Sequence, residues 1–442
     1  MPDLTHPETQ NEPWPTPVAP GPFHARVDVP GSKSATNRAL VLAALADGPS
    51  TITGALDARD TRLMREALSA LGAGIEMTGS TVRVTPPARF SPAPHGIDCG
   101  LAGTVMRFVP PLAALAEGST RFTGDDAASE RPLAPLLDGL CQLGAHVDGD
   151  AIPCTITTSG PLGGREVTID SSGSSQFISG LLLAGARLPR GLSLRHVSPS
   201  GSEVPSRPHL EMTVEMLTDR GVEISEPEPN HWLVQPGPVA ARDERIEPDL
   251  TSAAVFLAAA ALTGSTVIVP GWPSVTTQGG DEIREVLARM GARVDLVGDE
   301  LSVTGTGRLH GIDVDLHGSS ELTPVVAALG LLADKTTTIR GVAHIRGHET
   351  DRLAALEAEL TRCSGAVEQT PDGLRITGAG LTGTGLHAAD FHAYADHRMV
   401  HTAVLLGLVV PGCTVDDVAC TSKTINHFDE LWQVMLAGQD CA

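Results

Sequence analysis

The sequence predicts an α/β (α+β) fold of two domains, and three observations support that prediction. The chain has 442 residues, about twice the length of a typical domain. One pattern of helix, strand, helix, strand and strand recurs six times along it. The repeats keep a regular length, because the glycines expected to end the second helices lie 70 to 77 residues apart, at Gly72, Gly144, Gly221, Gly291, Gly365 and Gly438.

Each repeat contains an apolar segment rich in Ala and Leu, followed by a turn and a short β-branched segment. The six copies span residues 40–54, 112–124, 181–197, 256–271, 328–342 and 404–418. The apolar segments are predicted to be buried helices and the β-branched segments to be strands. A second helix then ends at the glycine, which accepts the left-handed backbone common at helix C-termini, and two short strands usually follow.

Three repeats per domain is the simplest division of the chain. We expect a first domain over residues 32–243 and a second over residues 23–31 plus 244–442. The segment 24–29 is predicted to be a strand that pairs with the last repeat, so that the chain crosses between the domains twice. Residues 1–22 are rich in Pro and polar side chains, and they are predicted to be a disordered tail.

The charge and the cysteines limit the classes of function. The formal net charge is −22, and an acidic surface repels nucleic acid and anionic membranes, so neither is an expected partner. The longest apolar stretches, such as 252–262, are too short to span a bilayer. Seven scattered cysteines without a C-x-x-C pair predict reduced thiols in a cytoplasm, with neither a zinc site nor a disulfide framework.

The use of lysine is unusual. Of 31 Lys and Arg residues only three are lysines: Lys33, Lys335 and Lys423. In a chain that otherwise uses Arg, a Lys can mark a need for a compact ammonium, which a planar guanidinium cannot replace. Chance explains a single lysine equally well. Lys335 lies in an apparent turn and is expected to be solvated.

The starts of the first helices are polar, and most are rich in Gly, Ser or Thr. They read GSKSATNR from Gly31, GLAGTVMR from Gly100, SSGSSQF from Ser171, PDLTSAA from Pro248, SSELTP from Ser319 and YADHRM from Tyr394. Free N–H groups and the positive end of the dipole make helix starts anion sites, although Ser, Thr and Asp are also ordinary caps. Nearby cations favour anion binding, because a cap needs none: Lys33, Arg38, Arg107 and Arg398.

Several second helices also start with charged residues. The segments are ERP at 130–132, SRP at 206–208, HETDR at 348–352 and SKT at 422–424. If the repeats are arranged alike, all these starts gather at one end of each domain. Two such ends facing one another predict a basic cleft inside an acidic protein, suited to small substrates with several phosphate and carboxylate groups.

In their order, the motifs GSKSATNR, GLAGTVMR, ERP, SSQF, HETDR, ADHRM and CTSKT resemble those of 5-enolpyruvylshikimate-3-phosphate synthases, over about residues 24–435. The resemblance implies two domains of three βαβαββ units, each an inside-out α/β barrel, with the active site in the cleft. It implies shikimate 3-phosphate contacts at Ser34, Arg38, Ser174, Ser175, Ser206 and Glu321. It implies phosphoenolpyruvate contacts at Lys33, Gly103, Arg131, Gln176, Arg352, Arg398 and Lys423, and further substrate-binding positions at Thr104 and His348.

The family's reaction transfers the enolpyruvyl group of phosphoenolpyruvate to the 5-hydroxyl of shikimate 3-phosphate, by addition and then elimination of phosphate. It belongs to chorismate and aromatic amino acid biosynthesis and requires no metal or organic cofactor. Glu321 is expected to be the general base, with a helix cap as its alternative. Lys33 is expected to act on the leaving phosphate and Glu349 on the methylene proton. Glyphosate is expected to compete with phosphoenolpyruvate beside Gly103.

The sequence departs from better-known members at two of these positions. Glu321 stands where many have Asp, and His348 where many have Lys. Three alternatives were weighed. A UDP-N-acetylglucosamine enolpyruvyl transferase has Lys-Asn at the position of Lys33 and Ser34 and a reactive loop Cys, which segment 119–131 lacks. An RNA 3'-terminal phosphate cyclase-like enzyme conflicts with the acidic charge. A silent anion-binding protein would not need the acid and base candidates. A monomer is expected.

Overall fold

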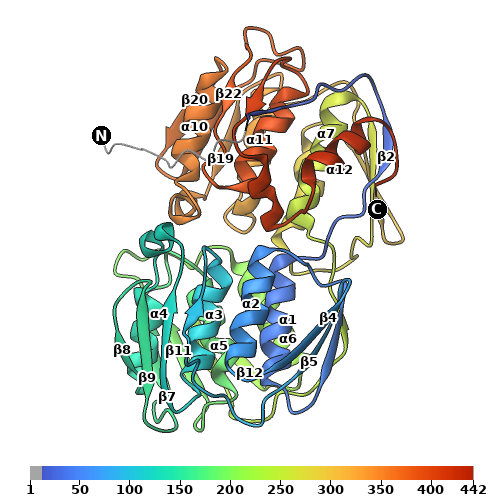
Figure 1. Cartoon of the computed structure of the whole chain (residues 1–442). Coiled ribbons are helices and arrows are strands. Elements are labelled where there is room, and N and C mark those ends of the chain that lie inside the picture. The colour runs from blue at the N-terminus through green and yellow to red at the C-terminus, as the bar shows by residue number, and fades with distance from the viewer. Residues whose placement is uncertain (1–11, 442) are drawn as a thin grey trace.

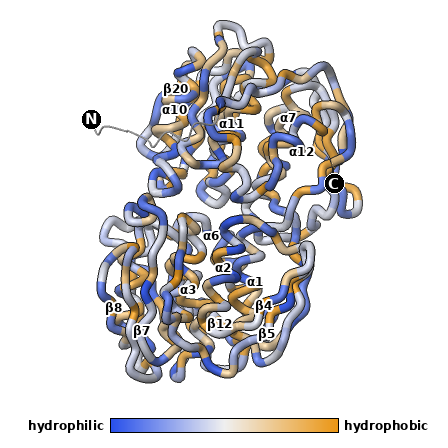
Figure 2. The backbone as a smooth tube through the Cα atoms, in the orientation of Figure 1, coloured by the Kyte–Doolittle hydropathy of each residue, from blue (hydrophilic) through white to orange (hydrophobic). Residues whose placement is uncertain are grey.

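The computed structural model describes residues 12–441, and residues 1–11 of the predicted tail lie outside the described residues. The chain folds into two halves stacked one on the other (Figure 1). The blue-to-green half carries α1 to α6, and the yellow-to-red half carries α7 to α12. Figure 2 shows apolar stretches within each half and hydrophilic segments at the ends that face each other. The predicted α/β architecture is confirmed.

The first half contains three four-stranded sheets, ordered β14-β3-β5-β4, β6-β7-β9-β8 and β10-β11-β13-β12. Its strands are β3 (Ser50–Thr53), β4 (Gly74–Thr78), β5 (Thr81–Thr85), β6 (Ile97–Asp98), β7 (Gly118–Thr123), β8 (His146–Asp148), β9 (Cys154–Thr158), β10 (Glu166–Ile169), β11 (Leu192–His196), β12 (Ile224–Glu228), β13 (His231–Val234) and β14 (Glu244–Arg245). Its helices are α1 (Lys33–Leu45), α2 (Arg59–Ala70), α3 (Gly103–Ala113), η1 (Asp126–Glu130), α4 (Ala134–Leu143), α5 (Gln176–Gly185) and α6 (Arg207–Thr218).

The second half contains the sheets β16-β17-β15-β2, β18-β19-β21-β20 and β1-β23-β22. Its strands are β1 (Trp14–Pro15), β2 (His24–Arg26), β15 (Thr266–Pro270), β16 (Arg293–Val297), β17 (Glu300–Thr304), β18 (Asp313–Asp315), β19 (Thr337–Arg340), β20 (Ala366–Thr370), β21 (Gly373–Thr377), β22 (Asp390–Phe391) and β23 (Thr414–Val415). Its helices are α7 (Leu250–Thr263), η2 (Gly279–Glu282), α8 (Ile283–Arg289), η3 (Ser320–Leu322), α9 (Thr323–Leu331), η4 (Ala343–Gly347), α10 (Arg352–Arg362), α11 (His397–Gly407), η5 (Val418–Lys423) and α12 (Phe428–Leu436).

Each half has its own hydrophobic core, built around helices that are apolar on almost every side. In α7 all twelve residues from Leu250 to Leu262 except Thr251 are buried, as expected for a helix packed all round. One core gathers residues between Ala39 and Ile246, and the other gathers Ala25, Val27 and residues from Leu250 onward. Within the part of the chain that the structure describes, no helix is long and apolar enough to cross a membrane.

The two halves exchange strands where the chain crosses between them. In four repeats the strand before the first helix pairs in parallel with the next strand of its own repeat, as β6 does with β7. The strands before α1 and α7 instead trade places: β2 pairs with β15, and β14 pairs with β3. The predicted pairing of segment 24–29 with the last repeat is confirmed only as one parallel bridge, between Val27 and Cys441, while the strand β2 itself pairs with the fourth repeat. The exchange also keeps Glu244 to Ile246 with the first half, past the boundary predicted at residue 243.

The N-terminal segment supplies a missing strand. Residues up to 22 were predicted to be disordered, but β1 pairs antiparallel with β23, and Thr16 donates from its backbone N–H and its hydroxyl to the Cys413 carbonyl oxygen. In the described part of the sixth repeat, no strand hairpin follows α12. β1 therefore takes the place that β21 holds beside β19 in the fifth repeat. Pairing with a distant strand thus overrides the tail-like composition.

Gly407 gives a test of this N-terminal strand. A Cβ at Gly407 would lie 2.0 Å from Thr16 Oγ1 and 2.5 Å from Thr16 Cβ, so Gly407→Ala should displace the segment. We expect a loss of about 1–3 kcal/mol in the free energy of unfolding, less any gain in helix propensity. In a Thr16→Gly background the clashing atoms are absent, so the same change should cost much less. Denaturant unfolding of the unchanged protein, the two single variants and the double variant measures these costs. Equal costs of Gly407→Ala in both backgrounds would contradict the contact between Gly407 and Thr16.

Candidate active site

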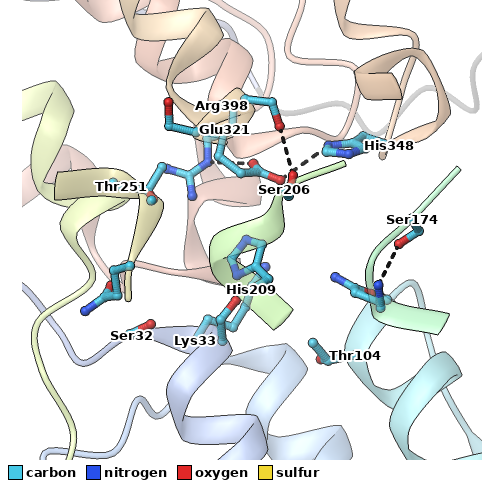
Figure 3. Close-up of a pocket in the computed structure, with 18 of the residues that line it drawn as sticks. Ser32, Lys33, Thr104, Ser174, Ser206, His209, Thr251, Glu321, His348 and Arg398 are labelled. Atoms are coloured by element: carbon cyan, nitrogen blue, oxygen red, sulfur yellow. Dashed lines mark hydrogen bonds and ion pairs between the residues drawn. The ribbon is translucent and has the colours of Figure 1, made fainter. Parts of the chain in front are cut away.

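A cavity lies between the two halves, and the starts of several helices point into it (Figure 3). From the first half it is lined by the beginnings of α1, α3, α5 and α6, and from the second half by η3, the end of η4 and α11. Figure 3 shows Lys33 and Thr104 on one side, with Glu321, Arg398 and His348 on the opposite side. The helix starts therefore gather as the repeat predicts.

Most of the predicted site residues lie on the surface of this cavity. They are Lys33, Ser34, Gly103, Thr104, Arg131, Ser174, Gln176, Ser206, Glu321, His348, Glu349 and Arg398. The other four, which are Arg38, Ser175, Arg352 and Lys423, are buried behind it. Arg38 donates to Thr213 Oγ1 at 2.7 Å and to the Ser34 carbonyl oxygen at 3.0 Å, so its guanidinium joins α1 to α6. Its predicted contact with substrate stays a prediction.

Arg352 lies at the centre of the second-half wall with its side chain only 1% exposed. It contacts three carboxylates: Asp396 at 2.7 Å from Nε, Glu321 at 2.7 Å from Nη1 and Glu349 at 3.0 Å from Nη2. Nη1 also lies 2.9 Å from His348 Nδ1, which must accept because a guanidinium can only donate. Arg352 therefore fixes the tautomer of His348 and the positions of two predicted catalytic carboxylates.

Both of these carboxylates stay ionised. Burial raises the pKa of Glu321, but Arg352, His348 and Arg398 together outweigh it and hold the pKa well below its ordinary value. Burial likewise raises the pKa of Glu349, but four nearby cations hold that pKa well below its ordinary value: Lys423, Arg352, Arg131 and Lys33. Glu321 is thus a weak base while the cavity holds no anion. An anionic substrate among the same cations would raise its pKa and make it a better proton acceptor.

Positive charge is left over on the cavity wall. Among residues 12–441, Arg107 and Arg131 have no carboxylate within ion-pair distance; they donate to the Pro132 and Leu101 carbonyl oxygens instead. Gly103 lets both approach the start of α3, because a Cβ there would lie 2.7 Å from Arg107 Nη1 and 3.1 Å from Arg131 Nη1. A small anion would supply the missing partner for these guanidinium groups.

Three acids in and around this site were not predicted. Asp60 lies 3.3 Å from Lys33 Nζ, and Asp249 Oδ2 accepts from the Lys33 backbone N–H at 3.2 Å. Asp396 holds Arg352. Asp249 and Asp396 stand inside quoted helix starts, where they also cap α7 and α11, so a cap was all that their positions indicated. Asp60 lies in a second helix outside every motif and had no signal of its own. In the described part of the chain, no cluster of His, Cys, Asp and Glu is arranged to hold a metal ion.

Histidines crowd the second-half wall. Burial lowers the pKa of His348 to about 4, and burial with the neighbouring His348 and His317 lowers that of His344 to about 3. His344 Nε2 lies 2.9 Å from Ser320 Oγ and 3.5 Å from Ser206 Oγ, which comes from the first half. The Ser206 backbone N–H also donates to the His317 carbonyl oxygen at 3.2 Å. These contacts already join the two halves across the cleft.

A cation-rich cleft with ionised carboxylates set among the cations, between two halves of three repeats each, defines a transferase that handles small anionic substrates. The chain belongs to the EPSP synthase family, because the family model described as EPSP synthase (3-phosphoshikimate 1-carboxyvinyltransferase) matches residues 18–432.

Known relatives agree with this assignment. A protein from Mycobacterium ulcerans (strain Agy99) named 3-phosphoshikimate 1-carboxyvinyltransferase is 50% identical over 434 residues, 97% of this chain and 98% of its own length. Two structures of EPSP synthase from Acinetobacter baumannii share the fold, with TM-scores of 0.76 and 0.75 at 23% and 22% identity, covering 95% of this chain and 97% of theirs. The predicted family and its enolpyruvyl transfer are confirmed, and the alternatives are not favoured.

His401 behind the site provides a pH test. Its ring stacks on Phe428 at 5.4 Å, and both of its nitrogens are buried without a hydrogen-bond partner among residues 12–441. Burial and then Arg398 hold its pKa well below 6.5. Below pH 6.5 His401 therefore binds a proton in the unfolded chain but not in the folded chain, so the free energy of unfolding falls as the pH drops. Replacing His401 with Phe should remove this penalty and stabilise the protein by about 2 kcal/mol more at pH 5 than at pH 8.

Denaturant unfolding at the two pH values measures the effect. His146→Phe is the control, because His146 is exposed on β8. The same change in stability at pH 5 and pH 8 for His401→Phe would contradict the assignment of a neutral, unpartnered imidazole.

Proposed function

We propose that the cleft binds shikimate 3-phosphate along the serine-bearing helix starts of α1, α5 and α6, and phosphoenolpyruvate among Lys33, Arg131 and Arg398. The observation that carries the proposal is the ion-pair network of Arg352. It holds two ionised carboxylates, Glu321 and Glu349, on the same cavity that Lys33 lines. The predicted contacts of Arg38, Ser175, Arg352 and Lys423 would need side chains behind the cavity surface to turn toward substrate.

The addition step forms a bond between the 5-oxygen of shikimate 3-phosphate and the enol carbon. Glu321 takes the proton of the 5-hydroxyl, after the substrates' negative charges have raised its pKa. The methylene carbon gains a proton, and we assign Lys33 as the donor because its ammonium lines the cavity and carries a proton: burial lowers its pKa, but Asp60 and Glu349 raise it above the ordinary value. Lys33 thus stays protonated, whereas Glu349 is ionised and suits the later step.

The elimination step breaks the bond between the enol carbon and the phosphate oxygen. Between the two steps Glu321 releases the hydroxyl proton to solvent and Lys33 takes up a proton again, so that Lys33 and the neighbouring guanidinium groups can neutralise the departing phosphate. The methyl group loses a proton, and Glu349, held by Lys423 at 3.3 Å and by Arg352, is the acceptor. These steps use only groups of the chain, so we propose that the enzyme works without a metal or organic cofactor.

Closure of the cleft is part of the proposal, because the substrate contacts come from both halves. Among residues 12–441, two chain segments cross between the halves, and they pair with each other at Gly31 and Pro248. Such a two-strand connection suits hinge motion. We further propose a cytoplasmic monomer that binds neither membranes nor nucleic acid, consistent with the net charge of −22. Glyphosate should compete with phosphoenolpyruvate beside Gly103.

The acceptor substrate tests the proposal most simply. Phosphate should be released from phosphoenolpyruvate when shikimate 3-phosphate is present, and not when UDP-N-acetylglucosamine replaces it. A phosphate assay with each acceptor, repeated after treatment with EDTA, measures both parts. Release with the sugar nucleotide alone would contradict the substrate assignment. Loss of activity on chelation that added metal restores would contradict the cofactor-free mechanism.

The lysines test the roles of single groups. Lys33→Arg keeps the charge, but a guanidinium is a very poor acid, so kcat should fall by about 10²–10⁴-fold. Lys423→Arg should raise KM for phosphoenolpyruvate, its predicted ligand, and lower kcat less than Lys33→Arg does, because its ammonium holds the acceptor Glu349 and donates no proton itself. Lys335→Arg is the control, since Lys335 lies exposed between α9 and β19. Steady-state kinetics of all three would count against the role of Lys33 if its Arg variant kept the normal turnover.

A further inference from the structure

Asp60 is a buried acid at the edge of the cavity, and the proposed mechanism gives it no contact with substrate. Its side chain is 4% exposed and lines the cavity. Lys33 Nζ, at 3.3 Å from Oδ2, is its polar partner, while Oδ1 is buried and has no hydrogen bond to any residue that the structure describes. Asp60 is likewise the carboxylate within ion-pair distance of Lys33 among residues 12–441. The two groups therefore depend on each other.

A role as a simple helix acid does not account for this arrangement. Asp60 lies in the first turn of α2, where an acid interacts favourably with the helix dipole, but an acid there needs no burial. The Thr61 hydroxyl already accepts from the Ala58 N–H at this end of the helix. A carboxylate taken out of water is costly unless a cation accompanies it. The pairing with Lys33 therefore explains why the Asp60 carboxylate is buried at the cavity.

Lys33 is held by one acid from each half of the molecule. Asp249, the N-cap of α7 in the second half, accepts from the Lys33 backbone N–H, while Asp60 on α2 in the first half holds the ammonium. The backbone contact fixes the start of α1 beside the crossing segments. The side-chain contact then decides in which direction the ammonium points.

We propose that Asp60 is a positioning residue for the transfer reaction, whose carboxylate aims the Lys33 ammonium at the reacting phosphate. The inference rests on the proposed role of Lys33. Asp60 does not touch the reacting atoms. Its negative charge also opposes that of the phosphate, so it improves turnover at some expense of phosphoenolpyruvate binding.

Other charged groups face Lys33 as well, and each would act on its titration: Asp60, Asp249, Glu349, Glu321, Arg398, His209 and His397. Burial lowers the pKa of Lys33, and Asp60 raises it more than any other neighbour does. Removing the charge of Asp60 should therefore lower the pKa of Lys33.

The three lysines of the chain make a direct measurement possible. Asp60→Asn and the unchanged protein are labelled briefly with an amine-acylating reagent over a range of pH, and each lysine is read by peptide mass spectrometry. Labelling of Lys33 at a given pH should rise about tenfold in Asp60→Asn, because more of its amine is free. Labelling of the exposed Lys335 is the internal reference and should not change.

Kinetics supply the second readout. In Asp60→Asn, kcat should fall at least about tenfold while KM for phosphoenolpyruvate does not rise, a split that a merely loosened site would not give. Asp60→Glu keeps the charge and should restore most of the normal labelling of Lys33. Asp57→Asn is the matched control: it removes an acid at the same end of α2 that is 52% exposed and paired with Arg65.

The outcomes separate this inference from the proposed function. Unchanged labelling of Lys33 in folded Asp60→Asn, or in Asp60→Ala if the first variant does not fold, would overturn it. So would a raised KM with normal kcat. If Lys33→Arg proves fully active, the assigned chemistry of Lys33 fails, yet the labelling still decides whether Asp60 holds the ammonium.

Discussion

The buried guanidinium of Arg352 is the interaction on which the rest of the site depends. It is neutralised by carboxylates from three separate segments: η3, the loop before α10 and the start of α11. A charge removed from water this completely is tolerated only with full pairing, so these segments must meet. Asp396 also accepts a hydrogen bond from the backbone N–H of Arg398 at 2.9 Å. The carboxylate that holds Arg352 therefore also positions Arg398, a cation on the cavity wall. The network thus orders Glu321, Glu349, His348 and Arg398 together before any substrate arrives.

The exchange of β2 and β14 explains how an acidic chain concentrates cations in one place. The two crossing segments hydrogen-bond to each other, with Ser32 N–H donating to the Glu247 carbonyl oxygen and Asp249 N–H to that of Pro30. This pairing sets the start of α1 against the start of α7 and leaves the other helix starts facing across the cleft. Ion pairs elsewhere on the surface are largely exposed and contribute little to stability. The cleft differs because its ion pairs around Arg352 are largely buried, while Arg107 and Arg131 are left to bind an anion.

Much of this could be predicted from sequence because the repeat is local. Apolar helices, glycine stops and polar helix starts each leave a signature within a few residues, so Lys33, Gly103, Ser206 and Glu321 were all assigned to one cavity. The predictions that failed concern contacts between residues that are far apart in the sequence. β1 and β2 are too short to reveal their partners, since pairing depends on which edge the fold leaves open. Asp60 looks like any acid in a first helical turn, and burial alone distinguishes it. Arg352 carried a recognisable motif, but its place behind the cavity surface did not follow from it.

A double-mutant cycle on Arg352 and Asp396 tests the central claim most directly. The free energies of unfolding of Arg352→Gln, Asp396→Asn and the double variant are compared with that of the unchanged protein. Each single change leaves a buried charge unpaired and should cost about 3–5 kcal/mol. The double variant should cost less than the sum of the two by about 1–3 kcal/mol, because the second change removes the charge that the first left alone. Additive costs would contradict the account, since Arg352 would then not be the group that holds the carboxylates of the site in place.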